Sequence, residues 1–187
     1  MRTIPNIKII EACDAEELRE AIIAAAEYVG PVYIRVVRSD LPEYEVKQMP
    51  EDYHFEMGKA TVIREGTDIS LVGSGIMVSR CKEAAEILAG KGISAEVINV
   101  STIKPLDEDT IVQSASKTRH VVTAENNTVI GGLGGAIAEV LGEKCPVKIG
   151  RIGIQDRFGH SGLIDELLDI YNLTTEDIVK KALEILE

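Results

Sequence analysis

Large aromatic side chains are scarce in this chain of 187 residues, which has no tryptophan and only 4% aromatic residues. Its core must therefore consist of aliphatic side chains, which a hydrophobic content of 45% can supply. An excess of basic residues is also missing, since 20 Lys and Arg stand against 31 Asp and Glu and leave a net charge of −11. This negative field repels nucleic acids and anionic lipids, so we expect neither as a partner.

Long apolar runs and paired cysteines are lacking as well. No stretch reaches the roughly 20 apolar residues of a membrane helix, and the opening MRTIPNIKII has no apolar signal core. The three cysteines, Cys13, Cys81 and Cys145, lie far apart and have neither zinc-site spacing nor a disulfide framework. The pattern predicts reduced thiols in a cytoplasmic protein, with no membrane span and no metal site.

From residue 58 onward the chain alternates between β-branched strands and amphipathic helices. Strands are predicted within 58–73 and at 94–100, 120–125 and 146–154, and helices at 77–88, 106–117, 133–141, 161–171 and 174–187. This alternation predicts an α/β fold, in which a mostly parallel sheet carries helices on both faces.

The N-terminal stretch, residues 1–40, has the pattern of one β-α-β unit. Asp14 is positioned to cap its helix, with Glu17 three residues later to complete a capping box. Two strands and one helix leave sheet edges and one face open, so we expect this unit to be the tail of a larger domain. Residues 41–57 are rich in charges and proline and predict a linker, which leaves 58–187 as the second domain.

Two glycine-rich corners follow predicted strands, the usual place for a bound phosphate. The first, Gly73-x-Gly75-x-x-Val78, lacks the third small residue of the dinucleotide fingerprint, and the next strand offers Asn99 instead of an acid. We therefore interpret it as a tight strand-to-helix turn.

The second corner contains Gly131, Gly132, Gly134 and Gly135, without the Gly-Lys-Ser/Thr of a phosphate loop. Glu125 beside it would repel a phosphate. The favoured interpretation is a close backbone approach, either within the fold or across an interface.

His160 lies in the segment DRFGHSG, near Asp156 and Ser161. These residue types suggest a hydrolase, but a catalytic triad is defined by geometry and its members normally come from separate loops. Ser161 is better explained as a helix cap, and we assign no catalytic residue in the chain.

Arg35 and Arg38 both fall in the predicted strand VYIRVVR. Arg38 is at its carboxyl end, where open parallel sheets bind ligands and where an arginine can hold a phosphate with two hydrogen bonds. A surface salt bridge explains its position equally well, and Arg35 receives no catalytic role.

Several segments, in this order, resemble the C-terminal part of the transketolase family of thiamine diphosphate enzymes. They are GPVYIRVVRSDLP, STIKPLDEDTI, VVTAENNTVIGGLGGAIAEVLGEKCPVKIGRIGIQDRFGHSG and LLDIYNLTTEDIV. The resemblance covers nearly the whole chain, from the last strand of the pyrimidine-binding domain (1–40) through the C-terminal domain (58–187). It is strongest toward the separately encoded C-terminal transketolase subunits of some prokaryotes.

The resemblance implies that this chain lacks the cofactor site. The family's Gly-Asp-Gly motif for thiamine diphosphate and Mg²⁺, and its activating glutamate, belong to parts with no counterpart here. One functional residue carries over, because VVRSDLP places the family's substrate-phosphate arginine at Arg38.

The implied function is a share in moving a two-carbon ketol unit between sugar phosphates, as in the pentose phosphate pathway. The chain would be inactive alone and would need an N-terminal subunit or missing domains, within a homodimer. The alternatives are the C-terminal domain of a deoxyxylulose phosphate synthase or of a 2-oxo acid dehydrogenase beta subunit, or a stand-alone nucleotide- or anion-binding module.

Overall fold

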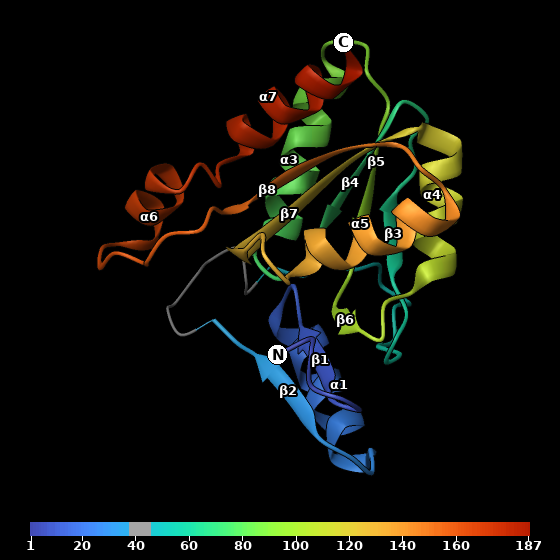
Figure 1. Ribbon diagram of the computed structural model, residues 1–187, viewed down its shortest axis with the longest axis vertical. Coiled ribbons are helices and arrows are strands. Elements are labelled where there is room, and N and C mark those ends of the chain that lie inside the picture. Colours follow the sequence, from blue (N-terminus) through green and yellow to red (C-terminus); the bar gives the residue numbers. More distant parts are fainter. Residues whose placement is uncertain (38–45) are drawn as a thin grey trace.

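The computed structural model describes residues 1–37 and 46–187 and arranges them around two sheets (Figure 1). The N-terminal unit contains β1 (Lys8–Glu11), α1 (Ala15–Glu27) and β2 (Val32–Arg35). The larger part contains β3 (Thr61–Arg64), β4 (Ile69–Gly73), α3 (Met77–Ala89), β5 (Ala95–Asn99), β6 (Thr102–Lys104), α4 (Glu108–Thr118), β7 (His120–Thr128), α5 (Leu133–Lys144), β8 (Lys148–Ile154), α6 (Ile164–Ile170) and α7 (Thr175–Leu186).

The larger sheet has the strand order β3-β5-β4-β7-β8 and is parallel except for the edge strand β3, which runs antiparallel to β5. From β4 the chain moves to β5 on one side, and from β7 to β8 on the other. The strand order therefore reverses between β4 and β7. At such a switch point the carboxyl ends of the strands border a crevice in which open α/β sheets bind ligands.

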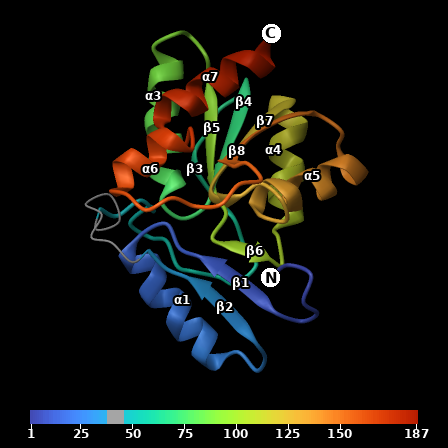
Figure 2. The same cartoon turned by 60° about the vertical axis from the view of Figure 1, so that its left-hand side comes forward.

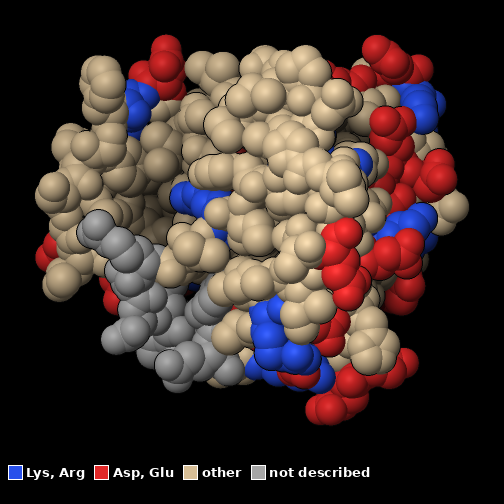
Figure 3. All heavy atoms as spheres, turned by 90° about the horizontal axis from the view of Figure 1, so that it is seen from below, with Lys and Arg blue, Asp and Glu red and all other residues tan. Residues whose placement is uncertain are grey.

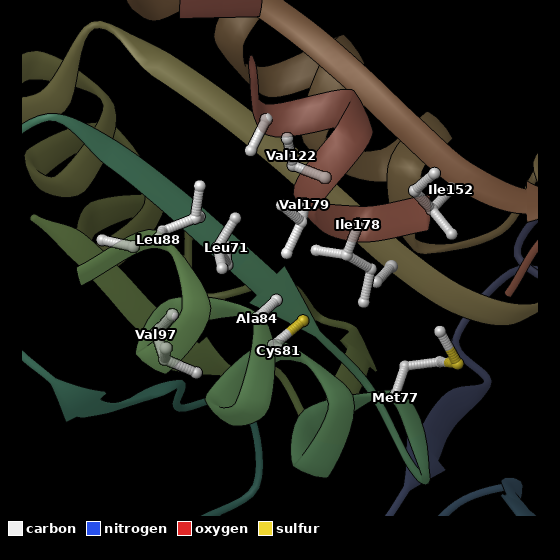
Figure 4. Packing of buried hydrophobic residues seen from close by; sticks show 14 of the residues in the cluster. Leu71, Met77, Cys81, Ala84, Leu88, Val97, Val122, Ile152, Ile178 and Val179 are labelled. Carbon is white, nitrogen blue, oxygen red and sulfur yellow. The ribbon is translucent and has the colours of Figure 1, made fainter. Parts of the chain in front are cut away.

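Helices cover both faces of this sheet (Figure 2), and the predicted fold class is confirmed. One face packs against α3 and α7 through aliphatic side chains such as Leu71, Leu88, Val122 and Ile178 (Figure 4). Cys81 lies fully buried in this cluster as a small core residue. The other face packs against α4 and α5. Burial on both faces explains why the central strands have near-continuous apolar sequences instead of alternating ones.

Three helix starts follow their sequence signals. Asp14, Asp107 and Thr174 each accept a hydrogen bond from the backbone amide three residues later. The prediction for Ser161 was wrong: α6 begins at Ile164, with Leu163 at the cap position. There the Glu166 carboxylate accepts the Leu163 amide at 3.2 Å, so a side chain inside the helix satisfies the start.

The small sheet has the order β2-β1-β6, so a strand from beyond residue 100 joins the N-terminal unit. The sequence did not reveal β6, which has only three residues. The predicted capping box at α1 forms only in part. Asp14 accepts a hydrogen bond from the Glu17 amide. The Glu17 carboxylate, however, accepts the Cys13 amide at 2.7 Å, and it also accepts hydrogen bonds from two residues outside this unit.

One of these two residues lies in the segment between the sheets, and the other ends β5. The Tyr53 hydroxyl donates to Glu17 at 2.6 Å, and the Asn99 side-chain amide donates to the same carboxylate at 2.8 Å. The Gln48 backbone amide donates to Asp14 at 2.7 Å. The described part of the predicted linker, residues 46–57, thus has no helix or strand but is fastened to α1 by buried carboxylates.

None of the helices in the described ranges is long and apolar enough to cross a bilayer.

Candidate functional site

The crevice at the switch point of the larger sheet is entered by two side chains of the N-terminal unit. Glu11 ends β1, Arg35 ends β2, and the two are directly paired in the register of these parallel strands. Their side chains form an ion pair in which Glu11 is 11% and Arg35 30% exposed. The position where an open α/β sheet usually binds a ligand is therefore filled by the chain itself.

Each member of this ion pair also contacts the larger sheet. Arg35 donates to the side-chain oxygen of Asn126 and, at 3.0 Å, to the Asn126 backbone oxygen. The Ser74 hydroxyl donates to Glu11 at 3.1 Å. Asn126 lies on β7 and Ser74 directly follows β4, so the ion pair bridges the two strands that border the switch point.

The first glycine corner is closed by Glu11. Gly75 has a φ of +53°, which strains any residue with a side chain. A Cβ there would also lie 2.9 Å from the Glu11 carboxylate. The predicted tight strand-to-helix turn is observed, and an acidic side chain stands where a nucleotide would place its phosphate.

The second glycine corner is closed by Glu125 in the same manner. Its carboxylate accepts the backbone amides of Leu133 and Gly134, both at 2.9 Å, at the start of α5. These are amides that a bound anion would otherwise use. A Cβ at Gly132 would overlap this carboxylate. The close approach predicted here is therefore made inside the fold, and its partner is a side chain in addition to backbone.

Glu125 is a buried carboxyl group whose pKa lies above its ordinary value. Burial, and to a smaller extent the nearby negative charge of Glu11, raise the pKa of its side chain, which comes to about 7 with all causes together. The amides of Leu133 and Gly134 and the positive charge of Arg151 act in the opposite direction and lower this pKa. Because a carboxylate occupies the anion position of each corner, the two glycine corners do not fit a diphosphate group.

Two cavities border the Glu11–Arg35 ion pair. The first, about 340 Å³, has mostly apolar walls that include Val36, Ile154 and Leu167, and Figure 3 shows the surface hollowed beside the lobe of α6. The second, about 320 Å³, also includes Glu125 and Gly132 in its walls. The polar side chains in the wall of the first cavity are Glu11, Arg35 and Asn126, together with His160 and Tyr171.

The residues of DRFGHSG do not form a triad. The His160 backbone amide donates to the Tyr171 hydroxyl at 2.6 Å, and the His160 ring stacks on the Tyr171 ring with centroids 5.9 Å apart. Asp156 and Ser161 are both exposed. Within the described residues there is also no group of three or more His, Cys, Asp or Glu that could hold a metal ion.

Arg38, the predicted substrate-phosphate residue, lies outside the described residues. The strand that leads to it ends at Arg35, three residues earlier than its sequence pattern suggested. Sequence reasoning missed Glu11 and Asn126 as partners of Arg35, and Ser74 as a partner of Glu11. The only signal was that each lies at or next to the carboxyl end of a predicted strand, where parallel strands bring residues together.

These features define a class of protein: an α/β sheet domain whose ligand crevice is closed by a second α/β unit. The chain belongs to the transketolase family, because residues 58–178 match the model described as "Transketolase, C-terminal domain". The predicted resemblance is thereby confirmed.

Relatives extend this match over the whole chain. A 6-deoxy-6-sulfo-D-fructose transketolase subunit of Clostridium sp. (strain MSTE9) is 48% identical, and the match covers 100% of this chain and 57% of the relative. A structure described as a split gene transketolase, inactive beta4 tetramer, is 41% identical with a TM-score of 0.91, covering 100% of this chain and 59% of that one. A 1-deoxy-D-xylulose-5-phosphate synthase of Caldanaerobacter subterraneus is 38% identical, covering 98% and 29%. The chain thus spans little more than half the length of the first two.

Proposed function

We propose that this chain is the C-terminal part of a transketolase-like enzyme that transfers a two-carbon ketol unit between sugar phosphates. The carrying observation is the closed crevice: Glu11 and Arg35 fill the usual ligand position of the sheet, and Glu125 fills the second glycine corner. Such a chain contributes to assembly and not to cofactor binding. Relatives named as transketolase subunits support the reaction class.

In this proposal thiamine diphosphate and Mg²⁺ bind to an N-terminal subunit or to further domains, and the isolated chain is inactive. The complete enzyme is a cytoplasmic homodimer. Arg38 binds the substrate phosphate, and no residue of this chain takes part in the chemical step. Calorimetry that detects micromolar binding of thiamine diphosphate to the isolated chain would contradict this division of roles.

The second candidate is the C-terminal part of a deoxyxylulose phosphate synthase, favoured by a relative that matches 98% of the chain. The product separates the two candidates. Formation of 1-deoxy-D-xylulose 5-phosphate by the complete enzyme would favour the synthase, and ketol transfer between sugar phosphates would favour the transketolase. A stand-alone nucleotide- or anion-binding module is disfavoured, because a carboxylate occupies each glycine corner.

The role of Arg38 is tested by Arg38→Ala in the complete enzyme. The KM for phosphorylated substrates should rise about ten- to a hundredfold, because a charge-assisted bidentate contact contributes roughly 1.5–3 kcal/mol. Unphosphorylated substrates should be spared. Arg19→Ala, which removes an arginine that is 64% exposed on α1, is the matched control. Equal losses on both substrate classes would show that Arg38 serves only the fold.

A further inference from the structure

Two buried carboxyl groups from different parts of the chain lie in the wall of the second cavity. Glu11 ends β1 in the N-terminal unit, and Glu125 lies on β7 in the larger sheet. Burial limits the screening of charge by solvent, so two negative charges repel more strongly here than at the surface. The two parts of the chain therefore meet at this cavity through groups that can carry like charges.

The ion pair of Glu11 and Arg35 joins the larger sheet at two points beside Glu125. The first is Ser74, whose hydroxyl donates to Glu11 at 3.1 Å. Ser74 directly follows β4, and Glu125 follows the last residue of β7 that pairs with β4, so the two are neighbours across these parallel strands. The second is Asn126, the residue after Glu125, which accepts hydrogen bonds from Arg35. A change in the charge of Glu125 therefore acts where the N-terminal unit is attached.

The titratable and charged side chains around Glu125 come from the elements packed about it. They are Arg2, Glu11, Tyr33, Arg35, Glu139 and Arg151. Both arginines in the cavity wall are paired with carboxylates. Burial raises the pKa of Glu125 most, the charge of Glu11 raises it further, and the charge of Arg151 lowers it to a smaller extent. Among the charged side chains, Glu11 thus has the largest effect on the proton of Glu125.

We infer that the proton on Glu125 controls a local opening between the two parts of the chain. With the proton in place, the ends of β1 and β2 stay closed on the larger sheet. Without it, the charge of Glu125 repels Glu11 and favours an open arrangement. The opening is local, because Ile7 and Ile9 belong to a core shared with the larger sheet and Val37 packs against the core on the other face.

The pKa of Glu125, about 7, sets the pH at which this opening responds. In the open arrangement water reaches the carboxyl group and the charge of Glu11 recedes, so the pKa of Glu125 is closer to its ordinary value. The proton therefore stabilises the closed arrangement fully below the pKa of the open one, and this stabilisation is lost as the pH rises through 7. The opening belongs to this chain and does not depend on the reaction proposed above.

Hydrogen exchange of the full chain at about pH 6 and about pH 8, corrected for the intrinsic effect of pH, tests the opening. The Glu11 amide donates to the Ser101 backbone oxygen at 2.8 Å and reports on the end of β1. Its exchange should be about three- to tenfold faster at the higher pH, because a pKa difference of one between the two arrangements corresponds to a factor of about ten. Since the opening is local, this rate should depend little on low concentrations of urea.

Two variants and a control decide whether the proton is responsible. Glu125→Gln is neutral at both pH values and should reduce the pH response to within about twofold. Glu11→Gln keeps an oxygen acceptor for Arg35 and Ser74 but removes the facing charge. It should lower the titration midpoint of Glu125, followed by NMR of the carboxyl carbon, by about 0.5–1 in pH. Glu143→Gln, on the exposed side of α5, should keep the full response.

Three results would overturn the inference. The first is exchange of the Glu11 amide that does not respond to pH, or responds equally in Glu125→Gln. The second is exchange that rises steeply with urea, which would mean that the whole fold opens. The third is an unchanged titration midpoint of Glu125 in Glu11→Gln, which would show that the two carboxyl groups do not interact.

Discussion

At the scale of single residues, Glu125 is a buried carboxyl group with a raised pKa. It is 2% exposed, it accepts two amides at the start of α5, and it lies near a second buried carboxylate, Glu11. The amides favour the charged form, while burial and the charge of Glu11 disfavour it more strongly. Burial therefore determines the outcome, and the pKa of Glu125 rises to about 7.

This pKa predicts how stability depends on pH. An ordinary glutamate has a pKa of about 4.3, so between pH 4.3 and 7 the folded chain keeps a proton on Glu125 that the unfolded chain has lost. The stabilisation from this proton is complete below about pH 4.3 and is lost as the pH rises through 7. The difference corresponds to roughly 3 kcal/mol in the free energy of unfolding.

Glu125→Gln should remove most of this dependence, because its side chain is neutral throughout. Urea unfolding at several values between about pH 5 and 8 measures the slope. At the acid end Gln should cost about 1 kcal/mol, since its oxygen replaces only part of the carboxyl contact with two amides. Glu143→Gln, on the exposed side of α5, is the control and should keep the original slope. The same slope in Glu125→Gln would show that another group titrates.

At the scale of elements, the start of α5 explains the glycine cluster. Gly132 has a φ of −89°, which any residue can adopt, so its small size is required by contact and not by backbone conformation. A Cβ at this position would overlap the Glu125 carboxylate and lie 2.6 Å from the Thr128 carbonyl oxygen. The cluster therefore needs no second chain to account for it.

Alanine substitutions at the N-cap of α5 and inside the helix should accordingly have opposite effects. Gly132→Ala should lower the free energy of unfolding by about 2–4 kcal/mol, because a buried carboxylate and a carbonyl must both move. Gly142→Ala, in the same helix with no atom within 4 Å of the added Cβ, should raise it by about 0.5–1 kcal/mol. Denaturant midpoints measure both.

A Glu125→Ala background provides the check on this explanation. There the cost of Gly132→Ala should shrink, because one of the two clashing groups is gone. An unchanged cost would mean that Thr128 alone accounts for it.

At the scale of the whole molecule, net charge opposes self-association, whereas exposed apolar surface favours it. The chain carries a net charge of −11, yet the face in Figure 3 is largely uncharged, with acidic side chains gathered along one side. Large exposed hydrophobic side chains occur in both the N-terminal unit and the larger part, among them Val36, Ile130, Phe158 and Leu163. Contact between two copies would cover some of these side chains.

We expect the chain to self-associate, and more strongly at high ionic strength. Salt screens the repulsion between two negatively charged copies, since the Debye length falls from about 10 Å at 0.1 M to about 3 Å at 1 M. Sedimentation equilibrium at low and high salt measures the effect. Phe158→Asp, at a side chain 96% exposed, should weaken association, whereas Ile87→Asp on α3 serves as the control. A monomer at high protein concentration under both salt conditions would contradict the expectation.

Local patterns were sufficient for much of this molecule. The alternation of strands and helices, the caps at Asp14, Asp107 and Thr174 and the aliphatic core were all predictable, because each depends on residues close together in the chain. The family resemblance added the identity of the domain. The sequence also indicated a tight turn at the first glycine corner and a close approach at the second, and the structure shows both.

Only the tertiary structure decided what fills those corners and what holds the N-terminal unit in place. Glu11 meets Ser74 across 63 positions, and Arg35 meets Asn126 across 91. β6 joins a sheet that begins almost a hundred residues earlier. Such contacts leave no periodic trace, because a single polar residue at a strand end has the same local sequence whether it faces water, a ligand or another part of the chain. Its partner is determined by where the fold brings the strand ends together.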